Sequence, residues 1–248
     1  MARVFADCAA VVLAGGQGTR LRSVLPDRQK VVAPVGGRPF LAWVLDRLDA
    51  AGVEVAVLCT GHLAGQVRVA LGARHGRLGL RYSIEPAPLG TGGALRLALA
   101  HTDVRTLLVL NGDSVSDVDV AAVVRRHHDR AARGTLVLAR VPDARRYGVV
   151  RVGRNCRVLG FEEKPPGARP GWVYAGIAVL ARELLAAAPA GRACSLEREL
   201  LPAWVAGGLE AYRTRQTFLD IGTPAAYAEA AHFCAARSVT GPGEPARG

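Results

Sequence analysis

Up to about Pro142, short apolar runs alternate with segments in which apolar residues recur every three or four positions. Short apolar runs bounded by turn residues are typical of buried strands, and the longer spacing is typical of helices that pack one face on a sheet. This alternation predicts an α/β fold: a Rossmann-like, doubly wound, mainly parallel central sheet flanked by helices. The expected strands are residues 9–13, 53–59, 80–84, 106–110 and 135–139, and the expected helices are residues 40–48, 63–71, 91–100 and 119–130.

Beyond Pro142 the pattern changes and strands dominate. Apolar segments on both sides of residues 153–155 predict a β-hairpin, because Gly and Asn favour tight turns. We expect a small β-rich part in the second half of a single domain that covers residues 1–236. Residues 237–248 are polar and rich in Gly and Pro, which predicts a disordered tail. The other expected elements are a strand at 172–180, a helix at 197–205, a strand or strand pair at 211–219, and a last helix from 224 to about 236.

The composition is that of a globular protein of a reducing compartment. The chain has 248 residues, 50% of them hydrophobic, which is enough for one substantial core. Its 5 cysteines are odd in number, widely spread and form no CxxC, so we expect neither a disulfide framework nor a zinc site, and a cytoplasmic location. No apolar run approaches the roughly 18 residues of a membrane-spanning helix, and no secretory leader is recognisable, so no membrane partner is expected.

The formal net charge of +11 and the pI of about 10.3 predict an anionic partner. Nucleic acid and small phosphorylated molecules compete for this role. The arginines are scattered, aromatic residues make up only 5%, and no zinc-finger spacing occurs, so small anionic molecules are favoured over nucleic acid. We expect the basic cluster at residues 125–130 to be the solvated face of a helix.

A glycine-rich segment, Leu-Ala-Gly-Gly-Gln-Gly-Thr-Arg-Leu at residues 13–21, directly follows the first expected strand. It is neither the GxGxxG dinucleotide fingerprint nor a P-loop. It lies at the carboxyl end of a central strand, where open α/β sheets bind ligands, and its glycines let backbone N–H groups approach an oxyanion. Arg20 has a guanidinium fork for a polyphosphate. Lys30 and Lys164 are the two lysines among 32 basic residues, and each is a candidate phosphate ligand.

Two segments supply carboxylates. Leu-Asn-Gly-Asp at residues 110–113 ends a buried strand, and a carboxylate such as that of Asp113 is costly there unless it is solvated, paired or bound to a metal. Phe-Leu-Asp-Ile-Gly-Thr-Pro at residues 218–224 carries Asp220, which on the residues alone is explained as a turn residue before the last helix.

The glycine-rich segment and the lysine that follows it resemble the signature of the sugar-1-phosphate nucleotidyltransferases. Further segments resemble the family in its order: residues 85–94, 110–113, 161–165 and 218–224. The resemblance spans roughly residues 8–232, and within the family it is closest to the D-glycero-D-manno-heptose 1-phosphate nucleotidyltransferases. The family's Pro-Lys-Pro reads Gln29-Lys30-Val31 here, which keeps the lysine and loses both flanking prolines.

The resemblance implies that the chain transfers a nucleoside monophosphate from a nucleoside triphosphate to a sugar 1-phosphate and releases pyrophosphate. It implies that Arg20, Lys30 and Asp113 are catalytic, that Asp113 and Asp220 bind Mg²⁺, and that the β-rich part binds the sugar. Thr91 is expected to cap the helix that begins there. The implied nucleotide-binding residues are Leu13, Ala14, Gly15, Gly16, Gly18, Thr19, Arg20, Lys30, Glu85, Leu89, Gly90, Thr91 and Gly112, and the implied sugar-phosphate-binding residues are Gly148, Glu163, Lys164, Tyr174 and Gly176.

Several alternatives stay open at this point. The favoured substrates are D-glycero-D-manno-heptose 1-phosphate with GTP or ATP, and the first alternative is mannose 1-phosphate guanylyl transfer or transfer to another hexose 1-phosphate. A different class is a non-catalytic nucleotide-sugar-binding regulatory protein, which predicts loss of the aspartates or of Arg20. His62 follows an expected strand and either touches the nucleotide or is an ordinary loop residue. Self-association into a homo-oligomer is also left open.

Overall fold

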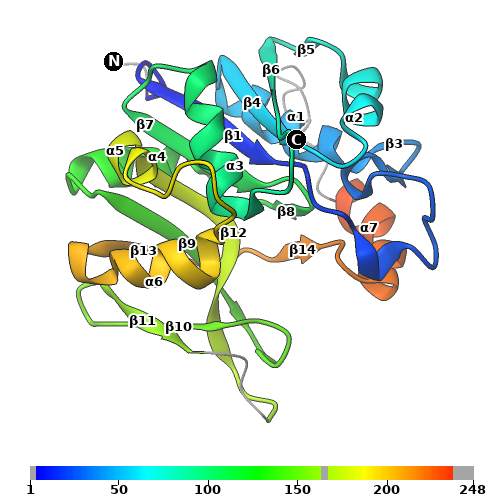
Figure 1. The fold of residues 1–248 in the computed structure, drawn as a ribbon. Helices are drawn as coiled ribbons and strands as arrows, with labels where there is room; N and C mark the ends of the chain where they lie inside the picture. Colours follow the sequence, from blue (N-terminus) through cyan, green and yellow to red (C-terminus); the bar gives the residue numbers. More distant parts are fainter. Residues whose placement is uncertain (1–3, 163–166, 237–248) are drawn as a thin grey trace, which may run out of the picture.

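The computed structural model describes residues 4–162 and 167–236. Its centre consists of four parallel strands, and β1, β4 and β7 are buried on both faces because helices cover both sides of the sheet. The parallel core expected from the alternating pattern is therefore confirmed. Across the sheet the order is β7 (Thr106–Asn111), β1 (Cys8–Leu13), β4 (Val55–Thr60) and β6 (Leu78–Ile84) (Figure 1).

Alternate side chains of β1 enter two separate hydrophobic clusters. Ala10 and Val12 belong to one cluster, and Val11 belongs to the other. Successive strand side chains point to opposite faces, so a short apolar run supplies both layers of the core. The first layer is completed by α1 (Phe40–Ala51), α2 (Ala64–Leu71) and α4 (Val120–Asp129), and the second by α3 (Gly90–Ala98) and α5 (Arg182–Ala186).

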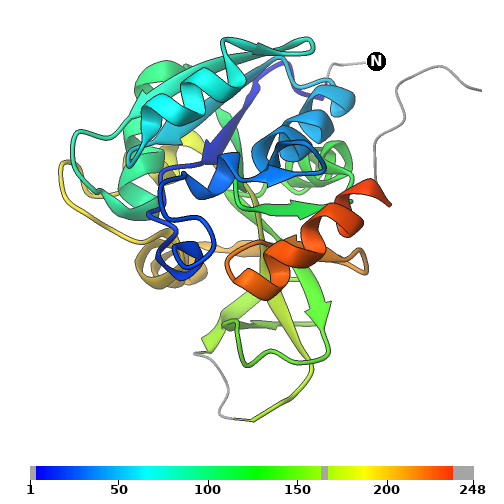
Figure 2. The same cartoon turned by 90° about the vertical axis from the view of Figure 1, so that its right-hand side faces the viewer.

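The second half of the chain extends the same sheet with strands that pair antiparallel, except that residues 209–214 pair parallel with residues 134–141. Residues 171–181 pair with β7 on one side and with residues 134–141 on the other. The expected hairpin is present at the far edge, and Figure 2 shows it below the main body of the molecule. These strands are β9 (Gly134–Val141), β10 (Val149–Val152), β11 (Val158–Glu162), β12 (Gly171–Ala181) and β13 (Leu209–Thr214).

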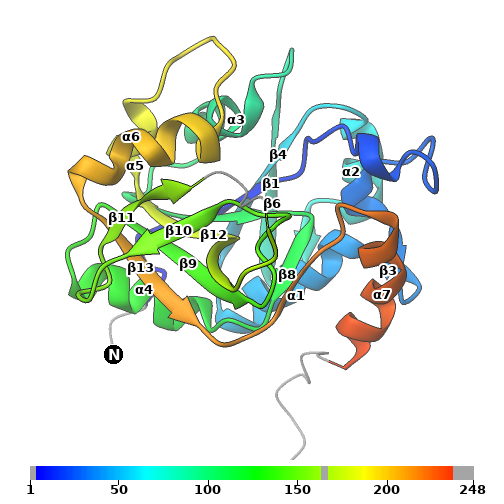
Figure 3. The same ribbon diagram turned by 90° about the horizontal axis from the view of Figure 1, so that it is seen from below.

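A separate two-stranded sheet joins distant parts of the chain. In it, β8 (Ser114–Ser116) pairs antiparallel with β14 (Phe218–Asp220), and Ser114 lies opposite Asp220. The segment at 211–219, expected as a strand or strand pair, is thus two strands in two different sheets. After β14 the chain enters α7 (Pro224–Ala235), which packs beside the hairpin of β2 (Pro34–Val35) and β3 (Arg38–Pro39), as Figure 3 shows.

The structure refines two expectations about local structure. The segment expected as a helix at 197–205 is helical, but it consists of a π-helical turn, Leu196–Leu200, that leads into α6 (Leu201–Trp204) and a 3₁₀ turn. The basic cluster on α4 is not wholly a solvated face, because His127 is buried and its Nδ1 lies 3.0 Å from Thr135 Oγ1. Burial lowers the pKa of His127 to about 4, so this ring is neutral at physiological pH.

Other elements were too short to give a periodic signal. They include β2, β3, β8 and α5, together with β5 (Arg74–His75) at the edge beside β6. Residues 237–248, expected as a disordered tail, lie outside the described residues. Among the described residues, none of the helices has the length and apolar character needed to cross a membrane.

Candidate active site

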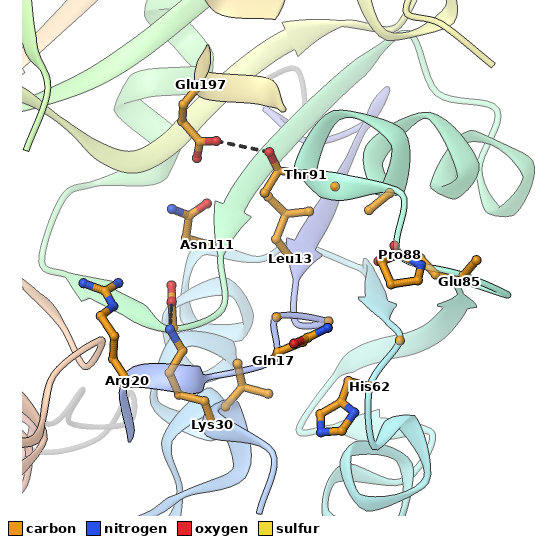
Figure 4. Close-up of a pocket in the computed structure, with 18 of the residues that line it drawn as sticks. Leu13, Gln17, Arg20, Lys30, His62, Glu85, Pro88, Thr91, Asn111 and Glu197 are labelled. Carbon is orange, nitrogen blue, oxygen red and sulfur yellow. Dashed lines mark hydrogen bonds and ion pairs between the residues drawn. The ribbon is translucent and has the colours of Figure 1, made fainter. Parts of the chain in front are cut away.

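A cleft of about 690 Å³ opens where the central parallel strands end (Figure 4). Its walls come from the loop after β1, the segment around Lys30, the loop between β6 and α3, and the ends of β7 and β14. Open α/β sheets bind ligands at this edge. The expected site residues that line the cleft are Leu13, Gly15, Gly16, Arg20, Lys30, Glu85, Gly90, Thr91, Asp113 and Asp220.

The glycine loop lies in close contact with its surroundings at two positions. A Cβ at Gly15 would lie 3.0 Å from Glu85 Oε1 and 3.1 Å from Gly61 N, so the loop can pass there only without a side chain. Gly18 has φ +58°, which disfavours other residues, and a Cβ there would lie 3.2 Å from the Cβ of Lys30. These glycines bring the loop against both Glu85 and Lys30. Gly16, by contrast, is exposed and has open space in front of it.

Two residues expected to bind nucleotide instead fix the ends of neighbouring strands. Gly112 N donates to Leu13 O at 2.8 Å, and a Cβ at Gly112 would lie only 2.8 Å from that oxygen. Ala14 is buried, and its N–H donates to Cys59 O at 2.8 Å. Both hydrogen bonds continue the strand pairing past the last strand residue. Asp113 is thereby held at the sheet edge beside the glycine loop.

The charged groups of the cleft converge at one end. Lys30 Nζ forms an ion pair with Asp113 Oδ2, with side-chain exposures of 12% and 27%. The pairing of β8 with β14 brings Asp220 to the same place. Burial, followed by the negative charge of Asp113, raises the pKa of Asp220, while Lys30, the Gly222 N–H and Arg20 oppose this rise. A further positive charge beside Asp220 would favour its ionised form.

Asp220 does not cap the helix that follows it. Thr223 caps α7, since its Oγ1 accepts from Ala226 N at 3.3 Å. Asp220 Oδ1 accepts from Gly222 N at 2.7 Å, and the side chain lines the cleft. The guanidinium of Arg20 lies against the same turn, because a Cβ at Gly222 would be 3.0 Å from Arg20 Nη2. Figure 4 shows Arg20 and Lys30 side by side at this end of the cleft.

A half-buried carboxylate occupies the other end of the cleft. Glu85 follows β6, and its Oε2 accepts from Leu89 N at 2.8 Å. Burial raises the pKa of Glu85, and the Leu89 N–H opposes this rise. In Figure 4 Glu85 and Pro88 lie on the side of the cleft away from Arg20. The carboxylate of Glu85 is thus a hydrogen-bond acceptor at a distance from the cluster of charged side chains around Lys30.

Thr91 does not cap α3, contrary to expectation. The helix begins at Gly90, and no side chain caps it. Thr91 Oγ1 instead accepts from Leu196 N at 2.7 Å and donates to Glu197 Oε2 at 3.1 Å. Cys194 O accepts from Gly92 N at 2.9 Å, so the first turn of α3 is fastened to the segment before α6.

Residues 9–237 match the family described as nucleotidyl transferase. The chain belongs to this family. The family and the sugar-1-phosphate nucleotidyltransferase class predicted from the motifs are therefore confirmed, and so is the α/β fold.

Named relatives of this nucleotidyltransferase include two kinds of guanylyltransferase. Mannose-1-phosphate guanylyltransferase of Mycobacterium tuberculosis is 37% identical over 220 residues, which are 87% of this chain and 61% of that protein. D-glycero-alpha-D-manno-heptose 1-phosphate guanylyltransferase of Aneurinibacillus thermoaerophilus is 35% identical over 226 residues, 89% of this chain and 96% of that protein. The chain thus spans less than two thirds of the mycobacterial relative. The crystal structure of HddC from Yersinia pseudotuberculosis complexed with GMP-PN has a TM-score of 0.81 and 28% identity, covering 91% of this chain and 98% of that one.

The sugar-phosphate residues predicted for the nucleotidyltransferase are only partly brought together. Gly148 is exposed, and Tyr174 lies on β12 with a buried hydroxyl. Gly176 has φ +74°, and a Cβ there would lie 3.0 Å from Asn111 Nδ2. Glu163 and Lys164 lie outside the described residues. The expected site residues that do not line the cleft are Ala14, Gly18, Thr19, Leu89, Gly112, Gly148, Tyr174 and Gly176.

Among the cleft residues of the nucleotidyltransferase, Asn111 and Glu197 were not predicted and the role of His62 was left open. Asn111 and Glu197 line the cleft, and Figure 4 shows Glu197 directed at Thr91. Asn111 was present in the Leu-Asn-Gly-Asp segment and could have been noticed there. Glu197 had no local signal, because its π-helical turn reads as an ordinary helix. His62 lines the cleft but is exposed, so both alternatives for it remain.

Proposed function

We propose that this nucleotidyltransferase transfers a guanylyl group from GTP to D-glycero-α-D-manno-heptose 1-phosphate. The observation that carries the proposal is the arrangement of one cleft, with Arg20, Lys30, Asp113 and Asp220 at one end and Glu85 at the other. A nucleoside triphosphate has a charged chain and a polar base separated by a ribose, which matches this division. The heptose and guanylyl relatives support the choice of substrates.

The reaction needs alignment and charge neutralisation more than proton transfer. An oxygen of the sugar 1-phosphate attacks the α-phosphorus of GTP, a new P–O bond forms, and the α–β bridging bond breaks with its electron pair leaving on pyrophosphate. The attacking oxygen is already anionic at neutral pH, so no general base is required. Arg20 and the glycine loop hold the departing pyrophosphate, and Lys30 stabilises charge on the α-phosphate.

Asp113 and Asp220 are suited to hold a divalent cation, which we propose to be Mg²⁺. Burial and the negative charge of Asp113 raise the pKa of Asp220, so an added cation would favour the ionised form of Asp220. Within the described residues there is no cluster of three or more His, Cys, Asp or Glu side chains, which disfavours a metal that needs an all-protein ligand set. Mg²⁺ accepts one or two carboxylates with phosphate oxygens and would add positive charge to the transferring phosphates.

Glu85 is suited to select guanine. The Watson–Crick edge of guanine presents two neighbouring donors, N1–H and N2–H, to which a carboxylate is complementary because it only accepts when ionised. Adenine presents an acceptor at N1, which the same carboxylate would repel. The Leu89 N–H and the wall at Gly15 hold the carboxylate in place. Binding guanine would stabilise the ionised form, which burial otherwise disfavours.

Unpartnered polar groups beside the cleft are suited to the sugar. Asn111 Oδ1 and Tyr174 Oη are buried and have no hydrogen-bond partner among the described residues. Such groups indicate a ligand or water that completes their bonding. Asn111 and Glu197 line the cleft, and sugar hydroxyls are suitable partners for both. Mannose 1-phosphate is the second candidate acceptor, favoured by the 37% identity to the mycobacterial relative.

A substrate panel tests the proposal. Purified full-length protein is incubated with GTP, ATP, UTP, CTP or dTTP, each with heptose 1-phosphate or mannose 1-phosphate, and pyrophosphate release is measured with and without Mg²⁺. We expect the highest kcat/KM for GTP with the heptose acceptor. Higher kcat/KM with mannose 1-phosphate would transfer the assignment to the second candidate. Nucleotide-sugar binding without turnover on any pair would contradict the proposal and favour a regulatory protein.

A further inference from the structure

The side chain of Gln29 is buried between the glycine loop and the turn that carries Lys30. Its exposure is 1%. Its Nε2 donates to Ala14 O and to Gly16 O, both at 2.9 Å, and its Oε1 accepts from Val31 N at 2.9 Å. Both amide hydrogens and the carbonyl are therefore used. A buried polar group with all its bonds made fixes the segments that it joins.

These hydrogen bonds set the direction of the loop's N–H groups. No peptide bond among the described residues is cis, and in a trans peptide the C=O and the following N–H point in opposite directions. Holding Ala14 O and Gly16 O toward Gln29 therefore turns the N–H groups of Gly15 and Gln17 away from it. Gly15 and Gln17 both line the cleft, and neither N–H has an acceptor among the described residues. These are the groups that a phosphate oxygen could use.

On its other side the same amide organises the lysine turn. Gln29 is the N-cap of the 3₁₀ turn Lys30–Val32, and its backbone carbonyl accepts from Val32 N at 3.0 Å. Its backbone N–H donates to Gln66 Oε1 at 2.8 Å, which ties the segment to α2. Its φ of −65° and ψ of 128° are values that proline also adopts. The backbone at this position thus keeps a proline-compatible shape without a proline.

We infer that Gln29 is a positioning residue that holds the glycine loop and Lys30 in their phosphate-binding arrangement before the substrate arrives. The amide restrains by hydrogen bonding a segment in which both prolines of the family's Pro-Lys-Pro are replaced. Gln29 does not line the cleft and does not touch the reacting groups. The inference rests on the proposed binding of a triphosphate at this loop.

Gln29→Pro and Gln66→Leu separate the contributions. Gln29→Pro suits the backbone angles and removes both the amide and the N–H. Gln66→Leu keeps the Gln29 amide and removes the acceptor of the Gln29 N–H, together with the hydrogen bond that Gln66 Nε2 donates to Asp27 O. Steady-state kinetics of the full chain should show the KM for GTP raised about tenfold and kcat lowered in Gln29→Pro, with the KM for the sugar phosphate changed less than about twofold. Gln66→Leu should stay within about twofold of the original protein. An unchanged KM for GTP and kcat in Gln29→Pro would overturn the inference.

Hydrogen exchange of the substrate-free protein gives a readout that does not depend on turnover. The Val31 amide should exchange slowly in the original protein and in Gln66→Leu, and at least tenfold faster in Gln29→Pro, since its acceptor is lost. If Gln29→Pro fails to fold, Gln29→Glu replaces it in the kinetic test. Glutamate keeps the shape of the side chain but places an oxygen against Ala14 O and Gly16 O, so it should show the same changes in KM and kcat. Normal Val31 exchange in a folded Gln29→Pro variant contradicts the inference. If Val31 exchanges faster in Gln29→Pro but the original protein turns over no triphosphate, the result would contradict the proposed function and not the positioning role of Gln29.

Discussion

Lys30 and Asp113 form an ion pair in the cleft, although they lie 83 positions apart in the chain. The pair joins the turn after the glycine loop to the end of β7. Each partner has a proposed task in the reaction, the lysine toward a phosphate and the aspartate toward a cation. When substrate and cation bind, both side chains must exchange this contact for new ones, so the shape of the lysine matters as well as its charge.

Lys30→Arg should lower kcat roughly 10- to 100-fold while the fold is retained. Arginine keeps the charge, but its planar fork cannot occupy the place of a compact ammonium that is paired with Asp113. Turnover of GTP and heptose 1-phosphate and a thermal melt measure the two effects. Arg22→Lys, an exposed basic position nearby, is the control and should leave kcat unchanged. Normal turnover in Lys30→Arg would mean that only the positive charge of Lys30 matters and not the shape of its side chain.

Asp220→Asn should make the metal-free protein more stable and almost inactive. The neutral amide relieves both the burial of a charge and its repulsion by Asp113, and it weakens cation binding. Thermal melts in a chelator and the Mg²⁺ dependence of turnover measure these opposite effects. Asp103→Asn, at an exposed position, controls for the change in net charge. If Asp220→Asn lowers the melting temperature in a chelator and leaves the Mg²⁺ concentration needed for turnover unchanged, Asp220 does not belong to the cation site.

Glu85→Gln should reduce the preference for GTP over ATP about 10- to 100-fold in kcat/KM. If the glutamine carbonyl accepts from Leu89 N, its NH₂ group faces the donors of guanine, and a complementary contact becomes a repulsive one. The ratio of kcat/KM for the two triphosphates is the measurement. Ile84→Ser, the exposed neighbour, is a suitable control. An unchanged ratio would place guanine selection elsewhere in the cleft.

Acidification should destabilise the protein through His127. Burial lowers the pKa of His127 from 6.5 to about 4, so between these pH values the unfolded chain binds a proton that the folded protein does not. The stability present above pH 6.5 is therefore lost progressively as the pH falls toward 4, by up to about 3 kcal/mol. Denaturant unfolding at several pH values should show this slope, and His127→Gln should lack it. Equal slopes in both proteins would exclude His127 as the cause.

The strands and helices with clear periodicity were predictable, and so were the segments that meet in the cleft. Arg20, Lys30 and Asp113 follow directly from short motifs next to strand ends, which the sheet then brings together. The direction of a single hydroxyl or amide was not predictable. Thr91 looked like a cap and bonds to Leu196 and Glu197, because a partner about one hundred positions away fits its hydroxyl better than the helix end does.

The role of Gln29 was hidden for a related reason. Its neighbours in sequence gave no sign that its amide would reach back to Ala14 and Gly16. Pairing with distant strands also determines the structure of the segment at 211–219, because its two strands join two different sheets. The local pattern could predict only one or two strands there. What the chain pattern could not supply was, in each case, the identity of a distant partner.

The small sheet of β8 and β14 makes the order of synthesis relevant to activity. Ser116 Oγ donates to Thr217 O at 3.3 Å across 101 positions, and this pairing carries Asp220 to Asp113. A nascent chain that has not yet emerged past Thr217 contains the glycine loop, Lys30 and Asp113 but has only half of the carboxylate pair. With the proposed cation site, turnover would therefore begin only once the C-terminal segment has docked on β8.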